Sequence, residues 1–218
     1  MKKGYIFLSG GGDLKDSFKL DEKFFSLLKP NAKILYIPVA LERDQAGYEA
    51  CRDWFSTVIS SHSREKDISF TMLLENDEIP DLNVYDAIYM GGGNTYKLLD
   101  YIYKEKLDKK LLDFIKKEGI IYGGSAGAMV LGKDIRTAEE ENDKNYLNYI
   151  GLNLIENKSI ICHYEENLDS KILLLTKRTN SEIIALPEDS GLIVNSEGEI
   201  IEIIGKAYIF SEGDKRSI

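Results

Sequence analysis

The segment Ile120-Ile121-Tyr122-Gly123-Gly124-Ser125-Ala126-Gly127-Ala128-Met129-Val130-Leu131 decides the fold class. It begins with bulky apolar residues typical of a buried strand and ends with residues typical of a helix start. Between them, Gly123-x-Ser125-x-Gly127 fits a nucleophile elbow, a sharp turn that exposes the serine hydroxyl. Small neighbours are needed because the backbone there is strained. The Ala126 amide then lies at a helix N-terminus, which favours negative charge.

The same alternation of strand and helix extends outward over most of the chain. Short apolar runs separated by amphipathic stretches predict βαβ units around a mostly parallel sheet. Strands are expected at residues 4–8, 34–39, 68–74, 87–90, 120–122 and 160–162. Helices are expected at about 16–28, 46–60, 95–117 with a break, 126–131 and 169–177.

Four closely spaced apolar runs end the sequence and predict an antiparallel β tail. These runs are residues 183–186, 191–194, 200–204 and 207–210, and short polar or glycine-containing turns separate them. We expect them to form a β-meander or a pair of hairpins. The whole chain, 1–218, is predicted to be a single α/β catalytic domain.

Composition excludes several classes of protein. The 28 Lys and Arg residues against 37 Asp and Glu give a net charge of −9, which disfavours nucleic-acid binding. Two cysteines are too few for a disulfide scaffold and suit a reducing compartment. No targeting signal and no run of about 20 apolar residues is present, so we expect a cytoplasmic protein without a membrane partner.

Metal and cofactor sites are not predicted. The two histidines, His62 and His163, exclude a three-histidine zinc site and an H-E-x-x-H motif. Glycine-rich segments at 10–12 and 91–93 complete neither G-x-G-x-x-G nor a P-loop. We interpret the segment at 10–12 as a tight turn that packs a helix against a strand.

A serine nucleophile needs a base and an acid that orients it. His163 follows the predicted strand 160–162, which puts it at the same sheet edge as Ser125. His62 lies in a polar stretch after a helix and is expected to be structural. Glu188 follows the strand 183–186 and is the candidate acid, with Asp189 as its neighbouring rival. Cys162 is expected to be a small core residue.

Three motifs together resemble the dipeptidase E and cyanophycinase family of serine peptidases. They are Tyr89-Met90-Gly91-Gly92-Gly93-Asn94-Thr95-Tyr96-Lys97-Leu98-Leu99, Gly124-Ser125-Ala126-Gly127-Ala128 and Leu186-Pro187-Glu188. The resemblance covers nearly the whole chain, including Asp134-Ile135-Arg136-Thr137 and the closing strands. It implies a three-layer α/β/α sandwich like that of class I glutamine amidotransferases.

The resemblance also implies roles for individual residues. Ser125 would be the nucleophile, His163 the base and Glu188 the orienting acid. The amide of Gly93 would join that of Ala126 in the oxyanion hole.

Further positions are candidates on the same grounds. Glu140 is a second candidate for the acid, and Asn94 and Arg136 are candidates for substrate binding. For Arg136 a surface salt bridge is the alternative to binding a substrate carboxylate. The 25 positions from His163 to Glu188 make a shorter segment than in aspartyl dipeptidase members, which disfavours aspartyl specificity.

The predicted function is therefore that of a serine peptidase acting on short peptides. One alternative is an esterase of the α/β-hydrolase type, in which the acid precedes the histidine, at Glu140 or Asp143. The other is a non-catalytic homologue that binds a small ligand.

Overall fold

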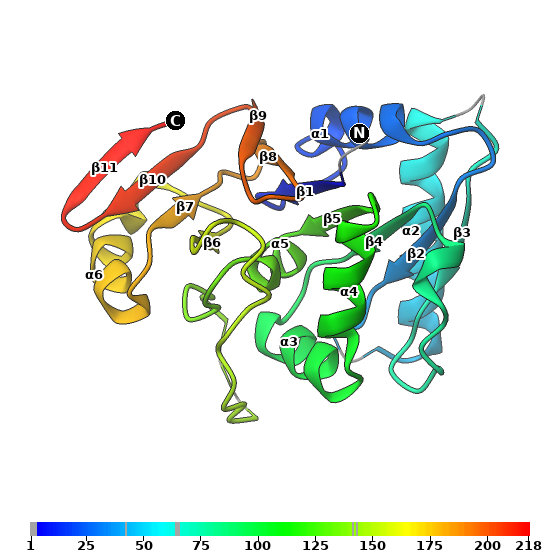
Figure 1. The fold of residues 1–218 in the computed structure, drawn as a ribbon, viewed down its shortest axis with the longest axis horizontal. Coiled ribbons are helices and arrows are strands. Elements are labelled where there is room, and N and C mark those ends of the chain that lie inside the picture. Colours follow the sequence, from blue (N-terminus) through cyan, green and yellow to red (C-terminus); the bar gives the residue numbers. More distant parts are fainter. Residues whose placement is uncertain (1–3, 42, 64–65, 141, 143) are drawn as a thin grey trace.

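The computed structural model describes residues 4–41, 43–63, 66–140, 142 and 144–218, which fold around two β-sheets (Figure 1). Within these residues, seven strands form the main sheet in the spatial order β3-β2-β4-β5-β1-β8-β9. The first five in this order are parallel, whereas β8 and β9 are each antiparallel to the preceding strand. The bounds are β1 (Tyr5–Ser9), β2 (Lys33–Ile37), β3 (Ser69–Met72), β4 (Ala87–Met90), β5 (Ile120–Gly124), β8 (Gly191–Asn195) and β9 (Ile200–Ile204).

Helices cover both faces of the main sheet, so the predicted three-layer α/β/α sandwich is confirmed (Figure 1). Tyr89 and Tyr122 pack on the face of α1 and α2, while the neighbouring Ile88 and Ile121 pack on the face of α3, α4 and α5. This alternation follows from the two-residue period of a strand. The bounds are α1 (Phe18–Leu27), α2 (Gln45–His62), α3 (Thr95–Lys104), α4 (Leu107–Lys116) and α5 (Ala126–Leu131), with a 3₁₀ turn η1 (Leu82–Val84) before β4.

The predicted break within 95–117 falls at Lys106. Its φ of +56° is in the left-handed region and separates α3 from α4. None of the helices in the described ranges is both long and apolar enough to span a membrane.

A second sheet contains four strands of the described chain, in the order β11-β10-β7-β6. Strands β6 and β7 are parallel, and β10 is antiparallel to both β7 and β11. Helix α6 packs on this sheet, and Ile172, Ile183 and Phe210 are among the side chains of their shared core. The bounds are β6 (Ser159–Ile161), η2 (Glu166–Leu168), α6 (Asp169–Thr179), β7 (Ile183–Ala185), β10 (Tyr208–Ser211) and β11 (Asp214–Ser217).

All four strands predicted for the tail exist and form two antiparallel pairs, β8 with β9 and β7 with β10, but they do not form one continuous meander. Strands β8 and β9 join the main sheet beside β1, whereas β7 and β10 join the second sheet. Because β6 and β10 occupy both edges of β7, β8 pairs instead with the open edge of β1. Strand β11 was not predicted, because Asp214-Lys215-Arg216-Ser217 is a polar edge strand without an apolar pattern.

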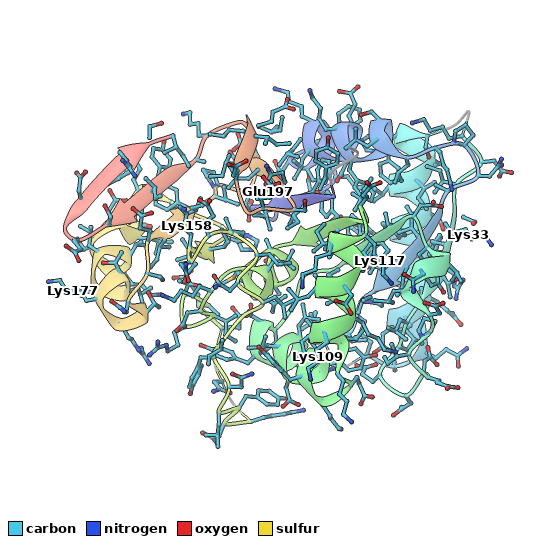
Figure 2. All side chains as sticks on the ribbon, viewed as in Figure 1. Lys33, Lys109, Lys117, Lys158, Lys177 and Glu197 are labelled. Carbon is cyan, nitrogen blue, oxygen red and sulfur yellow. The ribbon has the colours of Figure 1, made fainter. Side chains whose placement is uncertain are left out.

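Apolar side chains fill three clusters, and most charged side chains lie at the surface (Figure 2). Two clusters lie on the two faces of the main sheet, and the third lies between the second sheet and α6. Lys33 and Lys177, at opposite ends of the view in Figure 2, are both exposed.

Asp21 on α1 is a carboxylic acid that lies inside the apolar cluster containing Tyr122. Its side chain is fully buried, and Ser17 Oγ donates a hydrogen bond to its Oδ2 at 2.8 Å. Its Oδ1 has no hydrogen-bond partner among the described residues. Burial raises the pKa of this carboxyl, and the hydrogen bond from Ser17 opposes the rise.

The raised pKa of Asp21 predicts that stability falls as pH rises. Above the unfolded pKa of about 3.9, the native state binds more protons than the unfolded chain, so the free energy of unfolding decreases. Asp21→Asn keeps the shape but cannot ionise. We expect the difference in Tm between this variant and wild type to be larger at about pH 7 than at about pH 4. Each kcal/mol gained in the free energy of unfolding corresponds to about 2–4 °C in Tm.

Thermal unfolding followed by circular dichroism measures this difference. Asp53→Asn, at an exposed position of α2, is the matched control and is expected to change the Tm equally at both pH values. A Tm difference for Asp21→Asn that does not vary with pH would contradict the prediction.

Candidate active site

Ser125 occupies a strained turn between β5 and α5, as the sequence predicts. Its φ of +49° and ψ of −110° lie outside the regions that L-residues usually adopt. A Cβ atom on Gly123 would lie 2.5 Å from the Gly127 carbonyl, and one on Gly127 would lie 2.5 Å from the Met90 oxygen. Both glycines are therefore required by close packing. The Ser125 N–H donates to the Ser9 carbonyl at 3.2 Å, which fixes the turn to β1.

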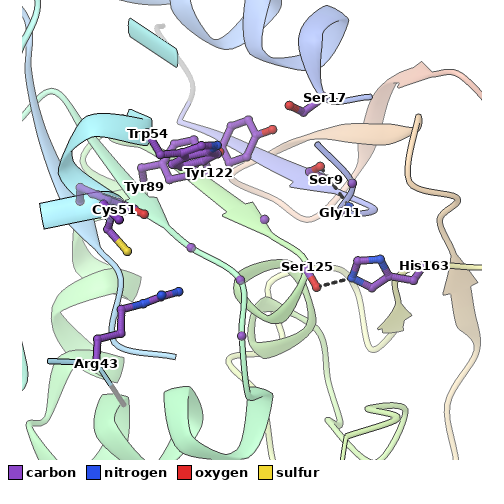
Figure 3. Close-up of a pocket in the computed structure, with 17 residues that line it drawn as sticks. Ser9, Gly11, Ser17, Arg43, Cys51, Trp54, Tyr89, Tyr122, Ser125 and His163 are labelled. Carbon is purple, nitrogen blue, oxygen red and sulfur yellow. Dashed lines mark hydrogen bonds between the residues drawn. The ribbon is translucent and has the colours of Figure 1, made fainter. Parts of the chain in front are cut away.

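A chain of short polar contacts begins at the Ser125 hydroxyl. Ser125 Oγ lies 2.7 Å from His163 Nε2 (Figure 3), and His163 Nδ1 lies 2.7 Å from Glu188 Oε1. The structure thus brings together the three residues assigned to the triad, although 47% of the His163 side chain and 54% of the Glu188 side chain are exposed. The rival carboxylate, Asp189, accepts a hydrogen bond from Ser190 Oγ instead.

The glycine-rich segment after β1 positions His163. The Gly10 carbonyl accepts the His163 N–H at 2.9 Å, and the Gly10 N–H donates to the Ser190 carbonyl at 2.9 Å. A Cβ atom on Gly11 would lie 2.3 Å from the imidazole Cε1, so Gly11 packs directly against the ring. The tight-turn interpretation missed this contact. A glycine run at the end of β1 was visible in the sequence, but its proximity to His163 depends on the arrangement of the two sheets.

Two backbone N–H groups lie at the same edge of the sheet. Gly93 follows β4, and Ala126 is the first residue of α5. Neither N–H donates a hydrogen bond to any residue in the described ranges. The loop of Gly93 faces the elbow, because a Cβ atom on Gly92 would lie 3.3 Å from Ser125 Cβ. Groups of this kind are able to bind a developing oxyanion.

Glu140, the second candidate acid, contacts a different part of the molecule. Its Oε1 accepts the backbone N–H of Thr95 at 2.6 Å, at the start of α3. Its partner is thus a helix N-terminus, whereas the His163 ring pairs with Glu188. Asp143, the other acid of the esterase alternative, lies outside the described residues.

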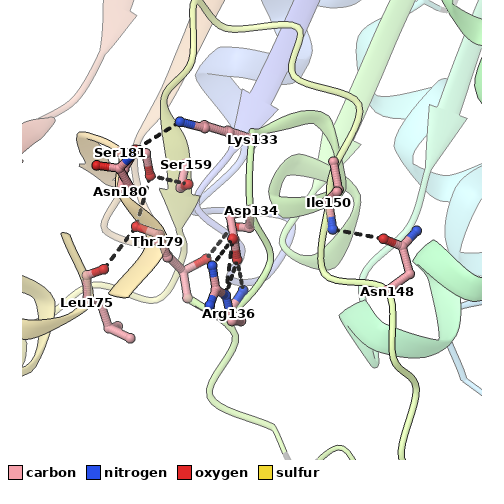
Figure 4. Close-up of polar contacts among 11 residues, drawn as sticks. Lys133, Asp134, Arg136, Asn148, Ile150, Ser159, Leu175, Thr179, Asn180 and Ser181 are labelled. Carbon is pink, nitrogen blue, oxygen red and sulfur yellow. Dashed lines mark hydrogen bonds and ion pairs between the residues drawn. The ribbon is translucent and has the colours of Figure 1, made fainter. Parts of the chain in front are cut away.

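Asn94 and Arg136 also have partners within the protein. Asn94 Oδ1 accepts the Lys97 N–H at 2.9 Å and so caps α3. Arg136 Nε lies 3.0 and 3.1 Å from the two carboxylate oxygens of Asp134 (Figure 4). Neither Asn94 nor Arg136 lines the cavity that contains Ser125.

Cys162 and His62 are packed as structural residues. Cys162 is buried beneath the elbow, its Sγ 3.5 Å from the Ser125 carbonyl oxygen, and burial raises its thiol pKa. The His62 ring stacks on Phe25 at 5.5 Å, and its Nδ1 lies 2.9 Å from the Val58 carbonyl oxygen.

Ser125 and His163 open into a cavity of about 470 Å³ (Figure 3). It lies between α1, α2 and the carboxyl ends of the parallel strands, where ligands of α/β sheets commonly bind. Burial raises the pKa of each tyrosine hydroxyl in its wall, so these groups are neutral. The side chains that line it are Ser9, Ser17, Tyr36, Arg43, Ala50, Cys51, Trp54, Tyr89, Tyr122, Ser125 and His163.

Comparison with curated proteins finds relatives named as peptidases. A Drosophila melanogaster protein named "Probable alpha-aspartyl dipeptidase" is 30% identical over 136 residues, which are 59% of this chain and 48% of that protein. A Peptidase E of Shewanella denitrificans is 23% identical over 86% of this chain and 82% of its own length. The chain thus spans about half the length of the Drosophila relative.

Comparison with solved structures finds the same fold. The crystal structure of a peptidase from an acI-B1 Actinobacterium superposes with a TM-score of 0.73 at 18% identity, covering 99% of this chain and 94% of that one. The model of Peptidase family S51 matches residues 6–204, which include the elbow, His163 and Glu188. This chain therefore belongs to peptidase family S51.

Proposed function

We propose that this protein is a serine-type peptidase that hydrolyses short peptides through an acyl-enzyme on Ser125. The proposal depends above all on the two 2.7 Å contacts that connect Ser125 Oγ through His163 to Glu188. Membership of peptidase family S51 supports the same chemistry. The cavity of about 470 Å³ and the dipeptidase name of one relative support a short peptide as substrate.

In the first step, Ser125 Oγ attacks the scissile carbonyl carbon while His163 Nε2 accepts the hydroxyl proton. His163 Nδ1–H donates to the Glu188 carboxylate, which holds the tautomer with Nε2 free and stabilises the imidazolium. The carbonyl oxygen becomes an oxyanion and accepts hydrogen bonds from the Gly93 and Ala126 N–H groups. One such donor contributed about 3–4 kcal/mol in another serine protease.

The tetrahedral intermediate then collapses, and the C–N bond breaks. His163 gives its proton to the leaving amine, and the acyl group remains as an ester on Ser125. Water enters, loses a proton to His163 and attacks the ester. The carboxylic acid product leaves, and the proton returns to Ser125 Oγ.

Replacing the nucleophile tests this mechanism. Ser125→Ala is expected to lower kcat for a library of dipeptides and isopeptides by about 10⁴–10⁶-fold, because no attacking oxygen remains. A fluorophosphonate is expected to label wild-type Ser125, which peptide mass spectrometry identifies. Ser26→Ala, at an exposed serine of α1, is the matched control and should keep full activity. Full hydrolysis by Ser125→Ala, or no labelling of wild type, would exclude the mechanism.

The two candidate acids are separated by a matched pair of variants. Glu188→Gln is expected to lower kcat by about 10²–10⁴-fold, because an amide donor disfavours the productive tautomer. The exposure of Glu188 favours the lower end of this range, since water screens its charge. Glu140→Gln retains an acceptor for the Thr95 N–H and is expected to keep kcat within about fivefold. The reverse pattern in steady-state kinetics would assign the acid to Glu140 and support the esterase alternative.

A further inference from the structure

The cavity beside Ser125 has a continuous aromatic wall (Figure 3). Tyr89 stacks on Tyr122 with ring centroids 4.3 Å apart, and Trp54 lies 6.1 Å from Tyr89. Tyr36 extends the wall and lies 6.2 Å from Trp54. The Trp54 side chain comes from α2, whereas the three tyrosines come from β2, β4 and β5. The three tyrosines are 0–3% exposed and Trp54 is 37% exposed, so Trp54 supplies most of the ring surface that a flat apolar group inside the cavity would contact.

Glycines form the passage between the nucleophile and this wall. A Cβ atom on Gly92 would lie 3.8 Å from Ser125 Oγ, and one on Gly91 would lie 3.6 Å from the Tyr36 ring. Since neither residue has a side chain, the space between Ser125 and the aromatic rings stays open. A side chain attached next to a carbonyl at Ser125 has access to the wall.

The position of His163 decides which part of the substrate takes this passage. The base must reach the leaving nitrogen to protonate it, so the leaving residue lies on the His163 side of Ser125. Figure 3 shows His163 on one side of Ser125 and the residues Arg43, Cys51 and Trp54 on the other. The acyl residue, which supplies the scissile carbonyl, therefore enters the part of the cavity lined by Arg43, Cys51 and Trp54, on the far side of Ser125 from His163.

We expect the aromatic side chains of the cavity to contribute more to substrate binding than the charge of Arg43. Arg43 lines the cavity, is exposed, and forms no ion pair with a residue in the described part of the chain. An exposed guanidinium gains little from a carboxylate, because water screens the pair. Burial of an aromatic side chain, in contrast, removes roughly 150–250 Å² of mostly apolar surface from water.

We infer that the cavity is the subsite for the acyl residue and that it selects a large aromatic side chain over a small or acidic one. This inference rests on the proposed function, since it requires an acyl group to form on Ser125. The cavity volume of about 470 Å³ lies within the range of sites that hold small ligands.

The test compares the rates at which diphenyl phosphonate analogues of phenylalanine, alanine and aspartate modify Ser125. Each reaction forms a bond from Ser125 Oγ to phosphorus and releases phenol, so its rate reports the subsite without peptide turnover. We expect the phenylalanine analogue to react at least about tenfold faster than the other two. Equal rates, or a faster aspartate analogue whose advantage is lost in Arg43→Gln, would overturn the inference.

Variants of Trp54 test whether the aromatic wall causes the preference for the phenylalanine analogue. Trp54→Ala is expected to reduce the phenylalanine-to-alanine rate ratio by about tenfold, whereas Trp54→Phe retains most of it. Phe18→Ala removes a similarly exposed aromatic side chain outside the cavity and should leave the ratio unchanged. An unchanged ratio in Trp54→Ala would refute the role of the wall.

A simple fluorophosphonate separates this inference from the proposed function. If it labels Ser125 while the phenylalanine analogue has no advantage, the subsite inference fails and the peptidase mechanism stands. If no phosphonate labels Ser125, both fail together.

Discussion

The backbone of Gly10 joins the two sheets, and the geometry of the candidate active site depends on this junction. Its N–H bonds to the segment after β7, and its carbonyl accepts the N–H of His163 after β6. A Cβ atom at Gly10 would lie 1.9 Å from the Pro187 oxygen, so no side chain fits there. Because Ser125 belongs to the main sheet, while His163 and Glu188 follow strands of the second, the distances between them are set by this contact.

The elbow concentrates backbone strain at the residue that carries the hydroxyl. A conformation like that of Ser125 costs of order 1–3 kcal/mol and persists only when its surroundings enforce it. Here the enforcement comes from Gly123 and Gly127, which allow α5 to pack closely against the ends of β5 and β4. The bond from the Ser125 N–H to Ser9 on β1 adds a further restraint. The rigid parallel sheet thus supports a turn that an isolated segment would not retain.

The two ends of the cavity have different environments. At one end the His163 and Glu188 side chains are about half exposed, which suits proton exchange with water. At the other end, aromatic residues on β2, β4, β5 and α2 form an apolar wall with neutral hydroxyls. Glycines between them keep the passage open. The proposed triad and the proposed acyl subsite therefore lie on different elements of the fold, and we expect substitutions in α2 to alter the subsite without changing the elbow.

The sequence by itself predicted most of the helices and strands, the elbow, and Ser125 and His163 as candidate site residues, because strand periodicity and the G-x-S-x-G spacing are local properties. It did not determine how the closing strands divide between two sheets, since the runs of β7, β8, β9 and β10 are similarly apolar and pairing depends on which edges are open. Local spacing likewise left Glu188 and Glu140 as rivals, and only the tertiary structure brought Glu188 to His163 and Glu140 to the start of α3. The contact of Gly11 with His163 and the aromatic wall were decided in the same way. Both join residues far apart in the chain, and their proximity follows from strand order rather than from any sequence spacing.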